Sequence, residues 1–303
     1  MARAGPTHRA DGKTTLDIAI HLGAHCTDED RIQRVLTDNR ARLRRQGIVV
    51  PPPGRARPAL RRALQARAAG RGGDEDVLDE LLDGASATPA RLVLSYEAFL
   101  GVYANVLAGD RMYPEAGARA RLLADLFPGH AVGFHFGLRN QASFVPALFE
   151  ASSVQRFGTF LEGQDLARMR WTDPVAAIRA ACPDVPLTVW CTEDLALIWP
   201  EVLRRLAGTD GPLQGEDAIL AEIMTEGGFR RLQAYLRDNP IRTQGTWRKV
   251  VAAFLRKYAR PERLEREIDL PGWTQGIIAG LTEHYAADVA AIRARDDVTV
   301  LGP

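Results

Sequence analysis

The stretch LDIAIHLGAHCTDEDRIQ, residues 16–33, decides the fold of this chain. Its apolar start, residues 16–20, predicts a buried strand, the turn 21–27 follows, and an amphipathic helix is predicted from Asp28 onward. A strand, a tight turn and a helix N-terminus form an anion site, because free backbone N–H groups and the positive end of the helix dipole meet there. In this chain, three acidic residues, 28–30, stand at the start of the predicted helix, where an anion would bind.

The rest of the chain alternates between strand and helix patterns. Further short apolar runs predict strands at 91–95, 131–138, 185–191 and, more weakly, 298–301. Helical patterns cover 28–47, 115–126, most of 216–266 and 273–295. This alternation is typical of a parallel sheet with crossover helices. The sequence therefore predicts a three-layer α/β sandwich with a mostly parallel sheet, as a single domain over 16–303 in which 216–295 is a mainly helical extension.

Composition excludes several classes of protein. The 303 residues carry a net charge of +1, so no bulk field recruits nucleic acid or a membrane surface. Residues 1–15 are polar and basic and predict a short disordered start, and no apolar stretch is long enough to span a bilayer. Cys26, Cys182 and Cys191 form neither a CxxC pair nor a metal cluster with histidine. We expect a cytoplasmic protein without a bound metal.

Charge is uneven between residues 40 and 83. Ten arginines and no acid lie in 40–73, and six acids follow in 74–83. Two interpretations remain open: two solvated helix faces that pair with each other, or a basic surface for a sulfated, phosphorylated or polyuronate ligand. No aromatic residue is interleaved with the arginines, which disfavours nucleic acid as the partner.

The segment 21–33 resembles the donor loop of bacterial sulfotransferases, which reads His-x-Gly-x-His-Lys-Thr-Gly-Thr-Thr-x-Ile/Leu-Gln. Residues 94–97, Leu-Ser-Tyr-Glu, are similar to the Ser-Ser-Glu signature of that family's second strand. Residues 134–149 resemble its strand, arginine and helix segment, and 281–292 resemble its C-terminal helix. The resemblance implies a P-loop-type α/β fold and the transfer of a sulfuryl group from the sulfonucleotide PAPS to a hydroxyl.

The resemblance also implies a donor site. In the family, the loop holds the phosphosulfate, and an arginine with a serine eight residues later holds the 3′-phosphate. The matching positions in this chain are Cys26, Thr27, Asp28, Glu29, Asp30, Arg139 and Ala147. The family's lysine, glycine, two hydroxyl residues and serine are replaced by Cys26, Asp28, Glu29, Asp30 and Ala147, whereas Thr27 and Arg139 remain.

These replacements oppose binding of a polyanion. Two like charges ~4 Å apart repel by roughly 4 kcal/mol at an effective dielectric of about 20, and every ~1.4 kcal/mol is tenfold in affinity. We therefore expect no cofactor here, and PAPS only if the donor site still functions. Thr27 and Asp30 match a capping pattern, with Asp28 and Glu29 in the first helical turn, so the chain's own carboxylates are predicted to cap the helix. A metal ion bridging these acids to phosphate is the alternative.

Other residues are candidates for chemistry. His21, His25 and Glu97 follow strands and are weak candidates for a general base; hydrogen bonding within the turn, or for Glu97 a helix cap, are the alternatives. Cys26 at a helix N-terminus is a weak candidate nucleophile, because the adjacent acids raise its pKa. Arg139 either holds a phosphate or neutralises one of the three acids at 28–30.

Together these observations favour a sulfotransferase-family protein with a degenerate donor loop, non-catalytic or altered in function, that binds a carbohydrate or an anionic small molecule. The alternative is an active sulfotransferase that acts on a glycan or small-molecule hydroxyl. A third hypothesis is an interaction role for the basic segment 40–71. The sequence specifies neither an acceptor nor an oligomeric state.

Overall fold

Six strands form one parallel sheet in a computed structural model that describes residues 15–71, 76–83, 89–264 and 268–303. Their order is β2-β3-β1-β6-β7-β8, and each neighbouring pair runs parallel. The strands are β1 (Asp17–His21), β2 (Ile48–Val49), β3 (Arg91–Ser95), β6 (Ala131–Leu138), β7 (Leu187–Cys191) and β8 (Thr299–Leu301). A separate antiparallel hairpin joins β4 (Leu107–Ala108) to β5 (Arg111–Met112). The predicted α/β class with a parallel sheet is confirmed.

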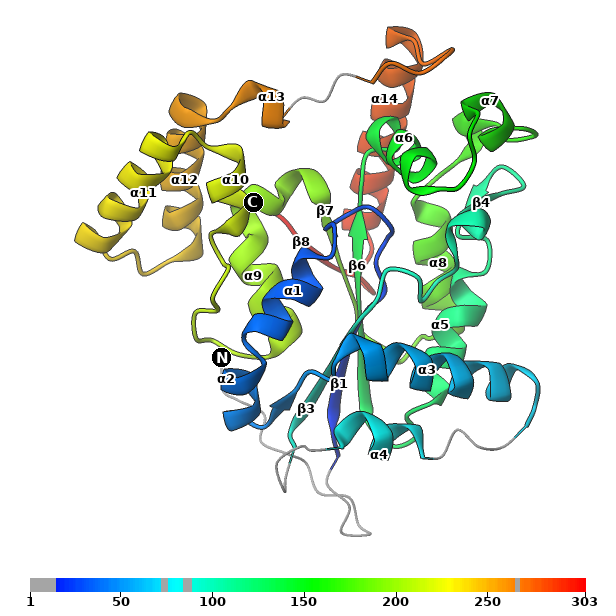
Figure 1. Cartoon of the computed structure of the whole chain (residues 1–303). Coiled ribbons are helices and arrows are strands. Elements are labelled where there is room, and N and C mark those ends of the chain that lie inside the picture. The colour runs from blue at the N-terminus through cyan, green and yellow to red at the C-terminus, as the bar shows by residue number, and fades with distance from the viewer. Residues whose placement is uncertain (1–14, 72–75, 84–88, 265–267) are drawn as a thin grey trace.

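Helices cover both faces of this sheet (Figure 1). One face carries α1 (Arg31–Asp38), α2 (Arg40–Arg45) and α9 (Leu195–Ala207). The other carries α3 (Pro53–Ala68), α4 (Val77–Leu82), α5 (Ala116–Asp125) and α8 (Thr172–Ala181). The helices α6 (Gln141–Ala151) and α7 (Phe157–Phe160) follow β6, and α14 (Gln275–Arg293) packs on α6 and α8. Short 3₁₀ turns cover Tyr103–Asn105, Leu166–Arg168 and Thr192–Asp194.

The region from residue 216 is mainly helical, as predicted. It contains α10 (Ala218–Ile223), α11 (Glu226–Asp238), α12 (Gln244–Tyr258) and α13 (Pro261–Leu264). The helices α10 and α12 contact α9, so this group adds to the helix layer on the face of the sheet that carries α1, α2 and α9 (Figure 1). None of the described helices is long and apolar enough to cross a membrane.

The two faces of the central strand β6 differ in character. Phe134, Phe136 and Leu138 are fully buried on the face covered by α5 and α8. Since side chains alternate along a strand, Gly133, His135 and Gly137 lie on the opposite face, toward α9. That face is built around Trp190 of β7 and Trp199 of α9. Gly137 lets Thr27 and the Trp190 indole approach the strand closely, whereas nothing lies within 4 Å of the position that a Cβ would take at Gly133.

Two details depart from the predictions. The first predicted helix, 28–47, is split, because Asn39 interrupts it between α1 and α2. The Asn39 amide nitrogen donates to the carbonyl oxygens of Val35 and Gln214, and its side-chain oxygen accepts from the amide of Gln214. A contact with a distant loop therefore ends α1. The edge strand β2 was not predicted, since it is only two residues long.

Where it is described, the charged segment is mostly a pair of interacting helices. Arg55 and Arg62 of α3 contact Asp83 and Glu80 at 2.8 and 2.7 Å. These are exposed pairs, which stabilise a fold little. The predicted pairing of the two helix faces is confirmed for them. The predicted disordered start, 1–15, lies outside the described residues except for Thr15.

Candidate functional site

The loop that follows β1, residues 22–30, lies at the centre of the sheet. Strand β1 is flanked by β3 and β6, and the strand order reverses beside it, since the chain adds β2 and β3 on one side and β6, β7 and β8 on the other. Ligands of open α/β sheets bind outside the carboxyl ends of the strands at such a point. Because α1 begins at Arg31, the predicted succession of strand, loop and helix is confirmed.

The backbone of the loop 22–30 adopts left-handed conformations at several residues. Gly23 has φ of 101°, and a Cβ there would lie 2.9 Å from the carbonyl oxygen of Glu97, so only glycine fits. Cys26, Glu29 and Asp30 have φ of 55°, 49° and 59° although none is glycine. Such residues persist where the surrounding contacts hold them. Two of those contacts are made by carboxylates of the chain itself.

Asp28 caps α1. Its Oδ2 accepts a hydrogen bond from the amide of Ile32 at 2.9 Å, so the side chain occupies the position at which the helix would offer an N–H to an anion. The side chain is buried, and burial raises the pKa of Asp28 to about 6 against a partial lowering by that hydrogen bond. The predicted capping of this helix by the chain's own carboxylate is therefore confirmed.

The prediction that Thr27 and Asp30 form this cap is wrong. The Thr27 hydroxyl donates to the carbonyl oxygen of Ala24 at 2.6 Å and does not reach the helix. Asp30 stands at the N-cap position in a left-handed conformation and makes no side-chain cap bond. Its carboxylate points outward to Arg57 at 3.6 Å. The left-handed turn at 29–30 carries the Asp30 side chain away from the amides and leaves the cap to Asp28.

We expect Asp28→Asn to stabilise the fold at neutral pH. The folded protein binds the Asp28 proton more tightly than the unfolded chain, since the pKa rises from 3.8 to about 6, so ionisation of this group lowers stability as pH rises through that range. A shift of this size corresponds to about 3 kcal/mol above pH 7, at 1.36 kcal/mol per unit. Asparagine keeps an oxygen for the Ile32 amide but carries no charge.

The measurement is urea unfolding of both proteins at pH 4.5 and pH 7.5. The gain in unfolding free energy should be about 1 kcal/mol at the lower pH and about 2–3 kcal/mol at the higher. Asp30→Asn is the matched control, because that side chain is exposed and makes no cap bond. An equal effect of both substitutions, or a gain independent of pH, would contradict the assignment.

Glu97 is the second carboxylate at the loop. Its Oε2 accepts from the backbone amide of Cys26 at 3.3 Å, and its Oε1 accepts from the Tyr103 hydroxyl at 2.9 Å. Burial raises the pKa of Glu97, and the acids at 28 and 30 add to this shift. Residues 97–100 form a turn, so the alternative role of Glu97 as a helix cap is wrong. Its carboxylate instead accepts a hydrogen bond from the Cys26 amide of the loop.

Arg139 follows β6 and reaches the loop from the other side. Its Nη1 donates to the carbonyl oxygen of Cys26 at 2.6 Å, and its Nε donates to the Ser143 hydroxyl at 3.0 Å. The described ion pairs of Glu29 and Asp30 are made with Arg31 at 3.0 Å and with Arg57. Arg139 therefore bonds to the loop backbone, and two other arginines pair with the exposed acids.

Ala147 lies on α6 one turn after Ser143 and is buried. Its methyl group provides no hydroxyl at the position where the family resemblance implies one. The hydroxyl that Arg139 contacts belongs to Ser143, four residues after the arginine. Sequence reasoning missed Ser143, although the arginine and serine spacing at the start of a helix could have indicated it.

His21 and His25 are both buried, and the Nδ1 atom of each ring bonds to a residue outside the turn. The Nδ1 of His21 lies 2.9 Å from the Ser95 hydroxyl, and its ring stacks on Trp190. The Nδ1 of His25 lies 2.9 Å from the Tyr113 hydroxyl, and this hydroxyl also accepts a hydrogen bond from the His25 backbone amide. Burial lowers the pKa of each histidine to about 4. Both rings are neutral at physiological pH, so each could accept a proton only weakly.

Cys26 is a poor nucleophile in this environment. Its sulfur lies 3.9 Å from the Tyr103 hydroxyl, and burial raises the pKa of the thiol to about 11. The thiol is therefore protonated at neutral pH, and the thiolate is the reactive form. The described residues contain no group of three or more His, Cys, Asp or Glu side chains placed to hold a metal ion.

The structure brings the loop candidates together and adds residues that the sequence did not indicate. Tyr103 and Tyr113 come from the segment before α5, which carries no motif, and they contact Glu97 and His25. Carboxylates, tyrosine hydroxyls and backbone amides bond to one another at the loop, while the Nε2 atoms of His21 and His25 have no partner among the described residues.

Comparisons with protein-family models, curated proteins and solved structures find no match to this chain. The fold itself, with its six-stranded parallel sheet and central loop before a helix, is compatible with P-loop-like folds.

Proposed function

We propose that this chain is a sulfotransferase-like protein whose donor loop is closed by its own carboxylates, so that it does not bind PAPS and acts without sulfuryl transfer. The observation that carries the proposal is the double occupation of the loop. The Cys26 amide donates to Glu97, and the Ile32 amide donates to Asp28. A phosphosulfate group would need these N–H groups.

Electrostatics supports the same conclusion. Beside the loop, the side chain of Asp28 is buried and that of Glu97 is half-buried, and water screens such charges poorly. A bound donor would bring its own negative charges to within a few ångströms of them. The family's lysine would offset this repulsion, but Cys26 occupies that position. The nearest retained cation, Arg139, already donates to the loop carbonyl of Cys26 and to Ser143.

An altered function therefore fits the site better than catalysis. A protein with this loop would use another part of its surface to bind a carbohydrate or an anionic small molecule. The alternative, an active sulfotransferase, requires PAPS to displace two carboxylates from hydrogen bonds within the fold.

The test is isothermal titration calorimetry with PAP, the desulfated form of the donor. We expect no binding at millimolar PAP, since each buried like charge lowers affinity by tenfold or more, at ~1.4 kcal/mol per factor of ten. Micromolar binding that disappears in Arg139→Ala would favour the active enzyme and overturn the proposal. Arg237→Ala, on the remote helix α11, is the control for nonspecific loss of positive charge.

A further inference from the structure

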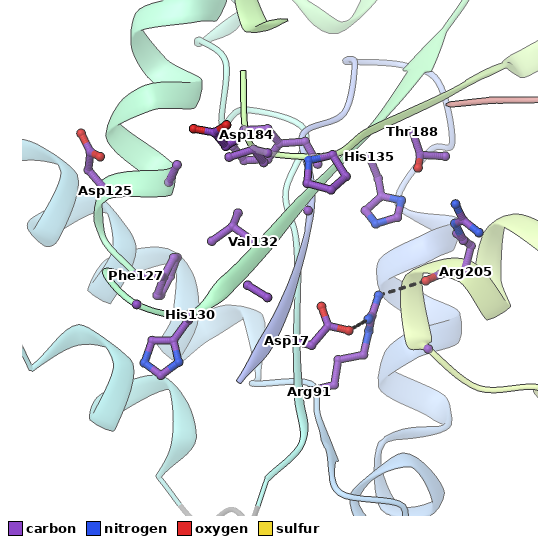
Figure 2. A pocket seen from close by; sticks show the side chains of 18 of the residues that line it. Asp17, Arg91, Asp125, Phe127, His130, Val132, His135, Asp184, Thr188 and Arg205 are labelled. Carbon is purple, nitrogen blue, oxygen red and sulfur yellow. Dashed lines mark hydrogen bonds and ion pairs between the residues drawn. The ribbon is translucent and has the colours of Figure 1, made fainter. Parts of the chain in front are cut away.

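A cavity of about 1130 Å³ opens at the amino ends of the strands, on the opposite edge of the sheet from the loop 22–30 (Figure 2). It is lined by the first residues of β1, β3, β6 and β7 and by the second half of α9. Its volume is large enough for a small-molecule ligand.

His135 of β6 is a buried polar residue in the wall of this cavity. Its side chain is only 6% exposed, and its Nδ1 has no hydrogen-bond partner within the described part of the chain. Burial, reinforced by the charges of Arg91 and Arg205, lowers the pKa of His135 well below its usual value. The ring is therefore neutral and can donate from one nitrogen. Buried polar atoms are rarely left without a partner, so a missing bond here indicates a ligand or an ordered water molecule.

The neighbours of His135 add a hydroxyl and open space to this part of the cavity. In the sheet register, His135 pairs with Thr188 of β7, so the two side chains lie on the same face. Gly133, two residues earlier on that face, has no atom within 4 Å of the position a Cβ would take. The floor of the cavity is thus open beside the imidazole.

Arg205 of α9 supplies a positive charge. Its guanidinium makes no hydrogen bond or ion pair to the described residues, whereas its backbone oxygen accepts from Arg91. Figure 2 shows His135, Thr188 and Arg205 together on one side of β6.

The other charges of the cavity are mostly paired. Arg91 binds Asp17, Arg204 binds Glu216, and Glu201 binds Arg248. Asp125 pairs with Arg121, and Figure 2 shows Asp125 and Asp184 on the opposite side of the strand. At the α9 end of the cavity this leaves the guanidinium of Arg205 as the cation without a described ion pair, with the carboxylate of Asp210 in the lining just after α9.

We propose that His135, Thr188 and Arg205 bind a tetrahedral oxyanion, the phosphate or sulfate group of a small molecule whose remainder occupies the cavity. An imidazole N–H, a hydroxyl and a guanidinium from three different elements line the same side of the cavity. A tetrahedral anion offers acceptor oxygens in several directions, which suits such donors, and charge-assisted bonds to arginine are the strong ones. The site is separate from the loop 22–30, so it does not depend on the state of the donor loop.

The experiment uses the full chain with inorganic phosphate and sulfate as separate probes, at constant ionic strength maintained with chloride. Calorimetry measures binding, and NMR of the histidine ring nitrogens reports whether His135 responds. We expect saturable binding with a shift of the His135 ring signals. The stronger of the two probes identifies the group that the ligand carries. Absence of saturable binding by both probes would overturn the proposal.

Two variants locate the binding. Gly133→Val places a side chain in the open floor, so it should abolish binding while the fold is kept or stabilised, since valine suits a strand better than glycine. Arg205→Gln should weaken binding about 10- to 100-fold, the range for loss of one charged hydrogen bond.

Matched controls are Gly280→Ala and Arg237→Gln, on the helices α14 and α11, which contribute no residue to the lining of the cavity. Both should bind as the unmodified protein does. Retained binding in Gly133→Val and Arg205→Gln, with normal melting curves, would place the anion elsewhere and overturn the assignment. An equal loss in the controls would show nonspecific binding and would overturn it as well.

Discussion

Replacing four residues of the loop should give this chain measurable affinity for PAP. The variant is Cys26→Lys, Asp28→Gly, Glu29→Thr and Asp30→Thr, which installs the family pattern that residues 21–33 resemble. It removes three negative charges and adds one positive charge. If each of these four charges contributes only ~1.4 kcal/mol after screening, affinity rises by about 10,000-fold. Dissociation constants in the micromolar range are therefore expected where the unmodified protein binds nothing at millimolar PAP.

The backbone gives a second reason for this effect. Glu29 and Asp30 adopt left-handed conformations that disfavour the β-branched threonine, so these substitutions destabilise the closed form of the loop. Glycine at position 28 removes the carboxylate that caps Ile32. The Ile32 amide then becomes available to an anion, whereas the backbone amide of residue 26 keeps Glu97 as its partner.

Calorimetry with PAP measures the change, and circular dichroism with thermal melting shows whether the variant folds. The control is Asp28→Asn with Glu29→Gln and Asp30→Asn, which removes the charges but adds neither lysine nor glycine. It should gain less affinity than the four-residue variant. If the four-residue variant folds but does not bind PAP, the loop charges do not account for the absence of PAP binding.

The regular parts of this fold could be predicted because they depend on local pattern. The strands at 91–95 and 131–138 agree with the prediction to the residue, since each is a short, mostly apolar run. The order of elements after β1 follows from the same alternation. The split of the first helix could not be predicted, because Asn39 bonds to Gln214, far away in the sequence.

The candidate site divides in the same way. A self-capped helix was predicted from the acids at 28–30, but the choice of Asp28 over Asp30 depends on backbone angles that no motif specifies. The partners of the histidines, Ser95 and Tyr113, come from other segments and follow only from the packing. The cavity at the amino ends of the strands has no sequence signature, since it arises where Gly133 leaves space beneath α9.

Acid should unfold this protein cooperatively below pH 6, because buried histidines must be protonated. His21 and His25 have pKa values of about 4 in the fold against 6.5 in an unfolded chain, so the unfolded state binds more protons between these values and stability falls as pH decreases through them. Each shift corresponds to about 3 kcal/mol. His135, whose pKa is also lowered, acts in the same direction.

Asp28 opposes this loss, because protonation of its carboxylate favours the fold between pH 6 and 4. The two histidines together lose about 6 kcal/mol from pH 7 to pH 4, and Asp28 returns about 2–3 kcal/mol, which leaves a net loss of about 3 kcal/mol before His135 is counted. That is a large part of the 5–15 kcal/mol typical of a folded domain. Asp28→Asn should therefore unfold over a narrower range of acid pH than the unmodified protein, although it is more stable at pH 7.

Tryptophan fluorescence during acid titration measures the midpoint, since Trp190 stacks on His21 and reports on this region directly. His25→Asn retains a polar group opposite Tyr113 but has no proton to gain, so its unfolding free energy should depend less steeply on pH between 6.5 and 4. His284→Asn, on α14 and away from the loop 22–30, is the control for the loss of an imidazole elsewhere in the fold. If the unfolding free energies of His25→Asn and His284→Asn depend on pH in the same way, the acid sensitivity has another origin. The neutral histidines His21 and His25 then do not account for it.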